Sequence, residues 1–495
     1  MNCPPSPPTR QKQDFTKVVG TYTAHFDQAQ LLDDDDDESA AAAAVTEDQR
    51  QKRQGKAAQV TDSYYEFATA AYEKNWSTRF HYAPFSPPDT LHSAQCFVEH
   101  RLALFMGLRP GMKVLDVGCG IGGPAREMAK LVGCEVVGIT INQAQVDRAI
   151  QLTAQEGLTG KCTFLKADWH DLPFAPNSFD AAFAIEATCH ASSLRTVYTN
   201  ICDVLKPGGV FGVSEWVLTP SFDPNNSRHI AMRNRMERGN GISNLHTSDE
   251  AREAITSAGF DVLHEEDFAR YFDYLMDKDK DKDKDKDKDK DKDSNTRTQA
   301  AAADRNSSGA AATTTKMAGA GTRTRTTEGS QTQFTSPVLI PYSSSSSSDN
   351  TNTNTSYSTN SSSGSGSVSN PTPNPDWRRA PTSGPLLITP SHHRDWWWLL
   401  EGKTDLATTW TDYWTAWKMS RFARRAWYAL VWTLEHLGYS RAQGVCEAMD
   451  TMADCVDSAV DAGKEGIFSP CWWFIARKPI GQIVVDGNME DRRKQ

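Results

Sequence analysis

A glycine-rich turn between an apolar strand and a helix places the strongest constraint on how this chain can fold. The turn reads Val114-Leu115-Asp116-Val117-Gly118-Cys119-Gly120-Ile121-Gly122-Gly123. Strands and helices alternate around it, and such alternation is typical of a parallel sheet with helices on both faces. The sequence therefore predicts a Rossmann-like, doubly wound, mostly parallel α/β sheet that binds ligands at the carboxyl ends of its strands. Strands are predicted at 114–117, 134–139, 162–165, 179–185 and 210–214, and helices over 124–131, 143–155 and 193–205.

Low-complexity segments divide the 495-residue chain, which has the length of two domains. Alternating Asp and Lys, followed by a tract rich in Ser, Thr and Asn, cannot bury a core, so this insert is predicted to be disordered. It is either a regulatory linker or an expanded repeat without a role. The predicted organisation is a largely disordered region over 1–60, a folded domain over 61–275, the insert over 276–385, a tryptophan-rich mixed α/β cap segment over 386–480 and a tail over 481–495.

Composition excludes several classes of protein. The net charge is −10 and no basic stripe occurs, which argues against a nucleic-acid partner. The ten cysteines are scattered singly, so we expect neither a disulfide framework nor a metal site, and a reducing compartment is the simplest interpretation. No apolar run has the length of a signal peptide core or a transmembrane helix. Any contact with a membrane is therefore expected to be peripheral.

The glycine-rich turn carries the first chemical signal. Glycines at 118, 120 and 122, with Cys119 between them, let the backbone approach a ligand closely, and the helix that follows favours an anionic group. A related turn binds dinucleotides, and a turn that serves only packing is the other alternative. Asp116 favours S-adenosylmethionine, because a carboxylate attracts a cationic methionine group and contributes nothing to binding a pyrophosphate.

Two later segments agree with this cofactor. Asp168 is placed to accept from the exocyclic amine of adenine, unless it only caps a helix or turn, and Trp169 can stack beside the base. The ribose is expected to meet Thr140, Asn142 and Gln143, although neutral groups bind hydroxyls more weakly than an acid does. The missing acid at this point also argues against NAD.

Several motifs make the chain resemble the sterol 24-C-methyltransferases, a family of class I S-adenosylmethionine-dependent methyltransferases. The resemblance covers 61–274 and 386–479, and the stretch Ile185-Glu186-Ala187-Thr188-Cys189-His190-Ala191 is its most specific part. Ser214 and the Asp395–Trp398 cluster depart from the family pattern and concern the acceptor pocket. The other matching stretches are Phe80–Pro84, Gly120–Glu127, Glu215–Val217 with Asp223–Asn226, Gly463–Pro470 and Ala476–Pro479.

The resemblance implies methyl transfer from S-adenosylmethionine to C-24 of a Δ24 sterol side chain, with a sterol as partner. It also implies a peripheral location at the cytoplasmic face of the endoplasmic reticulum or on lipid droplets, while a homo-oligomer remains an open alternative. A C-methyltransferase acting on another isoprenoid or a prenylated phenol is the nearest alternative. An NAD-linked dehydrogenase is disfavoured by Asp116, and a non-enzymatic scaffold by the intact glycine loop.

An alkene that accepts a methyl group becomes a carbocation, which the site must stabilise before a proton leaves. Aromatic faces do so by cation–π attraction, and buried carboxylates do so by charge. Tyr82, Trp216, Glu186 and Glu215 are the candidates, because both acids are predicted at strand carboxyl ends. We expect Glu215→Gln to keep cofactor binding and lose turnover. Core packing is the alternative for the two aromatic residues.

A base must remove the proton afterwards. His190 or one of the two carboxylates is predicted to serve, and His81 is a further candidate that is equally well explained as a core histidine. For the carboxylates the alternative is an ion pair with Arg79 or Arg126, since a buried acid needs a partner.

Overall fold

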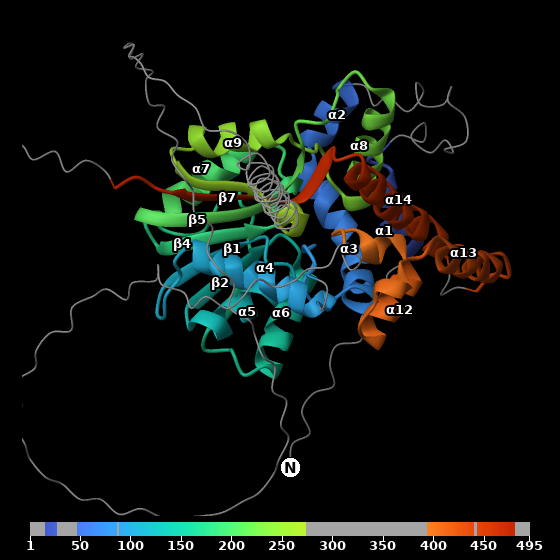
Figure 1. The fold of residues 1–495 in the computed structure, drawn as a ribbon, viewed down its shortest axis with the longest axis horizontal. Coiled ribbons are helices and arrows are strands. Elements are labelled where there is room, and N and C mark those ends of the chain that lie inside the picture. The colour runs from blue at the N-terminus through green and yellow to red at the C-terminus, as the bar shows by residue number, and fades with distance from the viewer. Residues whose placement is uncertain (1–14, 27–46, 87–88, 274–393, 440–442, 481–495) are drawn as a thin grey trace, which may run out of the picture. The chain divides into compact units, whose positions relative to one another are not determined.

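The computed structural model describes residues 15–26, 47–86, 89–273, 394–439 and 443–480 (Figure 1). Within them lies a seven-stranded sheet in the order β3-β2-β1-β4-β5-β7-β6. Strands β1 to β5 pair in parallel, and β7 runs antiparallel to β5 and β6. This confirms the predicted mostly parallel α/β sheet. The strands are β1 (Lys113–Val117), β2 (Glu135–Thr140), β3 (Cys162–Lys166), β4 (Phe179–Ile185), β5 (Leu205–Leu218), β6 (Asp261–Asp267) and β7 (Phe468–Arg477).

Helices cover both faces of the sheet, as Figure 1 shows. One face carries α4 (Leu91–Phe105), α5 (Gly123–Val132) and α6 (Gln143–Gln155), and the other carries α7 (Leu194–Val204) and α9 (Ser248–Ser257). Successive side chains of a strand point to opposite faces. Val114 accordingly packs in the core beneath α4 and α5, whereas Leu115 and Val117 pack in the core beneath α7. Asp116 therefore points to the α4 side.

Most predicted bounds agree with the structure within two residues. Helix α7 begins at Leu194 because Ser193 is its N-cap, with a side chain that accepts from the Thr196 amide. Strand β5 is much longer than predicted and continues to Leu218, because β7 pairs with it along its length. That partner lies more than 200 residues further along the chain, so no local pattern could reveal it.

The C-terminal segment is more than the predicted cap. Its helices α11 (Trp398–Glu401), α12 (Trp410–Met419), α13 (Arg421–His436) and α14 (Val445–Lys464) lead to β7, which lies inside the sheet between β5 and β6. Helix α14 packs along α8 (Ser227–Asn240). The segment therefore completes the same sheet as the first domain.

The described parts of the N-terminal region are helical. Residues 15–26 and 47–60 form α1 (Phe15–Thr23), α2 (Glu47–Gln54) and the start of α3 (Ala57–Asn75), whereas the rest of the region predicted to be largely disordered lies outside the described residues. Val19 and Tyr22 of α1 are fully buried against Tyr64 and Phe67 of α3. Apolar contacts between separate helices stabilise this region despite its polar composition.

Several predictions concern residues that the structure does not describe. The insert predicted over 276–385 and the tail over 481–495 lie outside the described ranges. None of the described helices is long and apolar enough to cross a membrane.

Candidate active site

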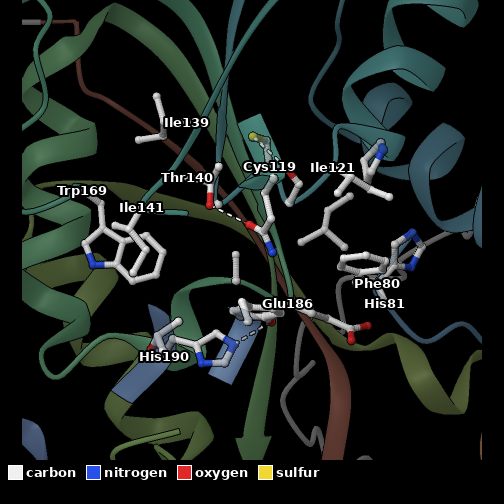
Figure 2. A pocket seen from close by; sticks show the side chains of 18 of the residues that line it. Phe80, His81, Cys119, Ile121, Ile139, Thr140, Ile141, Trp169, Glu186 and His190 are labelled. Carbon is white, nitrogen blue, oxygen red and sulfur yellow. Dashed lines mark hydrogen bonds between the residues drawn. The ribbon is translucent and has the colours of Figure 1, made fainter. Parts of the chain in front are cut away.

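A pocket opens at the carboxyl ends of β1 to β4 and is closed by residues of α3 and by the segment after it (Figure 2). The loop after β1, the loops after β2 and β3 and the turn η3 (Thr188–His190) all contribute to its wall. This is the ligand side of a doubly wound sheet, as predicted. Eight of the predicted site residues line it: Gly118, Cys119, Gly120, Thr140, Trp169, His81, Glu186 and His190.

The glycines of the loop have different tasks. Gly118 has φ +81°, and a Cβ there would lie 2.4 Å from the Cβ of Ala187, the residue after Glu186. Gly122 has φ +77°, and a Cβ there would lie 2.6 Å from the Phe164 ring, so this glycine serves packing and does not line the pocket. Gly118 thus keeps the loop in contact with the end of β4.

Asp116 lies two residues before this loop without bordering the pocket. Its side chain is buried, and its Oδ2 has no hydrogen-bond partner among the described residues. Burial, and then the nearby charge of Glu99, raise the pKa of Asp116 well above its ordinary value. Asp116 is therefore a buried carboxyl group behind the loop with one unpartnered oxygen, and a cationic ligand in the pocket would favour its ionised form.

The region after β2 contributes the predicted residue Thr140 to the pocket wall, and also Gln145, which was not predicted. Thr140 donates to Gln145 Oε1 at 2.7 Å. Asn142 caps α6 and donates to Asp62 of α3 at 3.0 Å, so a carboxylate from another helix stands near the position where the sequence showed no acid. Gln143 is exposed and outside the pocket wall, where it donates to Asp147.

Of the two predicted residues after β3, Trp169 lies in the pocket wall and Asp168 lies at the surface. Trp169 lines the pocket, in agreement with a stacking role. Asp168 has a side chain that is 43% exposed, does not line the pocket, and accepts from the backbone and ring nitrogens of His170 at 2.9 and 2.8 Å. The structure therefore favours the turn interpretation for Asp168.

Glu186 is the most constrained acid of the pocket. It follows β4, has φ +50° and is 6% exposed. Its carboxylate accepts from the Tyr82 amide at 2.8 Å and from the Trp216 indole Nε1 at 2.7 Å. Burial raises the pKa of Glu186 to about 7, although the charge of His81 and these hydrogen bonds act against the rise. Left-handed backbone at a residue other than glycine is uncommon and is concentrated at functional sites.

An aromatic cluster lies behind this carboxylate. The Tyr82 ring lies 5.6 Å from Trp216 and 5.2 Å from Trp396, and Trp216 lies 5.3 Å from Phe468. Trp396 and Phe468 also line a second cavity, formed largely by residues of the C-terminal segment. Tyr82 and Trp216 do not line the first pocket, so the cluster connects Glu186 to the second cavity. Trp396 was not predicted as a site residue.

The histidines are held in fixed protonation patterns. His81 donates from Nδ1 to the Tyr82 carbonyl at 2.8 Å and from Nε2 to Glu99 at 3.1 Å. Burial opposes its charge, but the bond and charge of Glu99 hold the pKa of His81 above its ordinary value. His190 donates from Nδ1 to a backbone carbonyl and accepts at Nε2 from the Tyr65 hydroxyl at 3.1 Å. Burial lowers the pKa of His190 to about 4, so it is neutral.

Glu215, predicted as a catalytic residue, does not line the pocket. Because β5 continues past it, its fully buried carboxylate points to the α7 side and accepts from Thr188 and from the Tyr198 hydroxyl at 2.8 Å. Burial raises the pKa of Glu215. Through Thr188 this carboxylate holds the η3 turn that carries His190.

Ion pairs with Arg79 or Arg126 were the alternative explanation for the buried carboxylates Glu186 and Glu215. The structure describes all four residues and shows neither pair. Arg79 pairs with Glu99 and Glu127, and Arg126 pairs with Glu156.

One group among the described residues has the composition of a metal site. Cys96, His100 and Glu127 place their ligand atoms within 4.8 Å of one another. The Glu127 carboxylate, however, already bonds to His100 at 2.8 Å and to Arg79 at 2.8 Å, which satisfies its charge. We assign no metal to this group.

Comparisons with known proteins find two matching parts of the chain. Residues 114–209 match a methyltransferase domain, and residues 414–480 match the sterol methyltransferase C-terminal region. The first match contains the glycine loop and, apart from Lys113, the strands β1 to β4, and the second contains β7.

Individual relatives give a more specific comparison than the two family models. A sterol 24-C-methyltransferase of Gibberella zeae is 46% identical over 221 residues, which cover 45% of this chain and 58% of the relative. Cycloartenol-C-24-methyltransferase 1 of Oryza sativa subsp. japonica is 42% identical over 219 residues, which cover 44% of this chain and 64% of the relative. The chain is therefore a relative of the sterol 24-C-methyltransferases, which confirms the resemblance found in the sequence, and it matches about three fifths of their length.

Solved structures show a weaker likeness. A geranyl diphosphate methyltransferase in complex with SAM is 19% identical, with 39% of this chain and 82% of that chain covered and a TM-score of 0.35.

Proposed function

We propose that this protein transfers a methyl group from S-adenosylmethionine to C-24 of a Δ24 sterol. One observation carries the proposal: the buried Glu186 carboxylate faces the pocket after β1 to β4 and is bonded to an aromatic cluster that borders a second cavity. The two cavities share no lining residue, and the aromatic cluster joins them through Trp396 and Phe468. We assign the donor to the first pocket and the acceptor side chain to the aromatic part of the second, whose wall also carries charged residues such as Asp267 and Lys464. The relatives named above are sterol and cycloartenol C-24-methyltransferases, which supports the acceptor.

The first pocket is the proposed donor site. Gly118, Gly120, Thr140, Gln145 and Trp169 line it and would hold the donor's polar groups and base. When bound, S-adenosylmethionine supplies an electrophilic methyl group on a sulfonium. The chain's part is alignment, because an alkene needs no base to attack, only a methyl group held in line.

The cluster around Glu186 is the proposed cation site. As the alkene electrons form the new carbon–carbon bond, the carbon–sulfur bond breaks, its electrons stay on sulfur, and the positive charge moves to the side chain. The Glu186 carboxylate stabilises that charge, and the faces of Tyr82, Trp216 and Trp396 add cation–π attraction in a site that excludes water.

Loss of a proton then restores a neutral side chain. We assign the proton to Glu186, whose pKa of about 7 suits both uptake and release. His190 is the weaker candidate, since its Nε2 already accepts from Tyr65 and its pKa is about 4. His190 would then act by positioning Tyr65 in the pocket wall.

The pH dependence of the reaction follows from Glu186. Because burial raises its pKa from 4.5 to about 7, the carboxylate forms only as the pH rises through 7, and kcat/KM should rise with it. The same shift destabilises the folded state by up to about 3 kcal/mol as the pH rises from below 4.5 to above 7. A pH–rate profile and a pH series of urea unfolding measure both effects. Glu186→Gln should flatten the unfolding series, and an unchanged series would contradict the assigned pKa.

Asp116→Asn separates donor binding from stability. The variant removes a buried carboxyl group that has an unpartnered oxygen, so the thermal midpoint of the ligand-free protein should stay equal or rise. Affinity for S-adenosylmethionine should fall about tenfold or more, because asparagine cannot ionise in response to the positive charge of the donor. Calorimetric titration and thermal melts measure the two quantities. Wild-type affinity in this variant would remove Asp116 from the donor site.

The proposed reaction is tested by incubating the purified protein with S-adenosylmethionine and a panel of sterols, with and without a Δ24 alkene. Mass spectrometry should find a product heavier by one methylene only with Δ24 sterols and only with the donor. If the donor binds and a prenylated phenol or another isoprenoid reacts instead, the fold assignment stands and the acceptor is different.

The acceptor also bears on location. A sterol is carried by membranes, so we propose peripheral contact with a membrane, at the cytoplasmic face of the endoplasmic reticulum or on lipid droplets. This location and the oligomeric state are open to fractionation and sedimentation measurements.

A further inference from the structure

Helix α12 presents a row of aromatic side chains, of which Trp417 is half-buried and the other three are exposed. Trp410, Tyr413, Trp414 and Trp417 recur at the spacing that places residues on one face of a helix. Their rings contact edge to face in sequence, with centroids 5.7, 5.9 and 5.4 Å apart. Trp410 is 77% exposed and Trp414 is 50% exposed, so the row does not serve the protein's own core.

Helix α13 continues this surface. Phe422, Leu430 and the C-cap residue Leu437 are exposed, and their spacing of about two turns places them on one side of α13. Trp427 and Trp432 are also exposed. Ala423 is the only residue of α13 that is buried. Figure 1 shows α12 and α13 at the periphery, with α13 extending away from the sheet. We call the exposed aromatic and aliphatic residues of 410–439 the aromatic surface.

Exposure is not a general property of the tryptophans in this segment. Trp396, Trp398 and Trp473 are almost fully buried and build the wall beside the second cavity and the core. The tryptophan-rich segment therefore has two parts, one that closes the interior and one that faces solvent. Isolated soluble proteins rarely expose large contiguous apolar patches without a partner.

Charge indicates the kind of partner. The 410–439 stretch holds four basic residues and two acidic ones, in a chain of net charge −10. Arg421 and Arg424 pair with Asp457 of α14. Lys418 and Arg425 are therefore the basic residues that the surface offers to a partner. One of the two acids, Asp412, is buried and accepts from the Leu91 amide and the Thr409 hydroxyl, so it adds little charge to the surface. Basic residues beside exposed tryptophans match the headgroup region of an anionic bilayer, where Trp and Tyr are favoured.

We propose that the aromatic surface of α12 and α13 docks the protein on an anionic lipid bilayer. The proposal rests on the proposed function, because a sterol acceptor must be taken from a membrane. Tryptophan side chains enter the headgroup boundary while Lys418 and Arg425 meet lipid phosphates. Docking needs neither S-adenosylmethionine nor a working active site, so the two proposals can fail separately.

Vesicle flotation tests this proposal with the full chain. Wild type should float with vesicles of phosphatidylcholine and phosphatidylserine, and less with phosphatidylcholine alone. Trp414→Ala/Phe422→Ala/Trp427→Ala should lower the vesicle partition coefficient about tenfold or more. Lys418→Gln/Arg425→Gln should mainly remove the preference for phosphatidylserine.

A matched control replaces exposed leucines elsewhere. Leu104 of α4 and Leu131 of α5 are 75% and 45% exposed, and Leu104→Ala/Leu131→Ala should float like wild type. Activity on detergent-solubilised sterol should be equal in all of these proteins, which keeps a failure of docking distinct from a failure of the reaction. Wild type that floats with neither vesicle, or an aromatic variant that floats normally, would overturn the proposal. The proposal would also be overturned if wild type formed a dimer in the absence of vesicles and only the aromatic variant were monomeric, because the surface would then bind a second copy of the chain.

Discussion

Replacement of Glu186 by glutamine is expected to lower kcat by about 10²- to 10³-fold while the affinity for S-adenosylmethionine stays close to that of wild type. Glutamine has nearly the same shape, but its single amide oxygen can accept from either the Tyr82 amide or the Trp216 indole, and its NH2 group then faces the other N–H donor. It cannot supply the negative charge that the developing cation needs, nor take up its proton. Donor titration and single-turnover product formation measure the two quantities separately.

Glu215→Gln is the matched control for this experiment. Glu215 is as deeply buried as Glu186, but its carboxylate bonds to Thr188 and Tyr198 outside the pocket. We expect this variant to lose stability and to keep kcat within a few-fold of wild type, contrary to the expectation from sequence alone. A large loss of kcat in Glu215→Gln at unchanged stability would show that the charge acts over a longer range than the contacts indicate.

Gly118→Ala is expected to weaken S-adenosylmethionine binding about a hundredfold. The new methyl group would lie 2.4 Å from the Cβ of Ala187, so the loop or the end of β4 must move. An overpacked contact of this kind costs up to about 3 kcal/mol, and about 2.7 kcal/mol corresponds to a hundredfold in Kd. Because Ala187 follows Glu186, the same shift should displace the Glu186 carboxylate and lower kcat.

Gly111→Ala isolates the effect of the backbone from that of the clash. Gly111 has φ +82°, almost the value of Gly118, and a Cβ there would meet no atom within 4 Å. Both variants carry the strain of a left-handed alanine, about 1–2 kcal/mol of stability. Only Gly118→Ala should change donor affinity. Equal donor affinity in the two variants would show that contact with Ala187 is not what shapes the pocket.

Local patterns placed half of the residues predicted to bind the cofactor in the wall of the pocket. The strand, the glycine turn and the helix are contiguous in the chain, so Gly118, Gly120 and Thr140 could be placed from sequence. The segment Ile185–Ala191 likewise carried Glu186 and His190 to the pocket as one piece. These residues are close in space because they lie at the ends of neighbouring parallel strands.

Residues brought in from distant elements could not be placed in this way. Tyr65 of α3 contacts His190, and Trp396 of the C-terminal segment contacts Tyr82. Glu215 was misplaced for a related reason. The pairing of β5 with β7 extends β5 to Leu218, and strand alternation then turns Glu215 away from the side on which Trp216 meets Glu186.

The most direct test of the account is the position of a labelled methyl group. The protein would be given S-adenosylmethionine with a deuterated methyl group and a Δ24 sterol, and the product's side chain would be examined by NMR, in wild type and in Glu186→Gln. The account predicts that wild type places the intact CD3 group on C-24 and that Glu186→Gln binds both ligands yet forms little product. Label at any other position, or equal product from the two proteins, would contradict it.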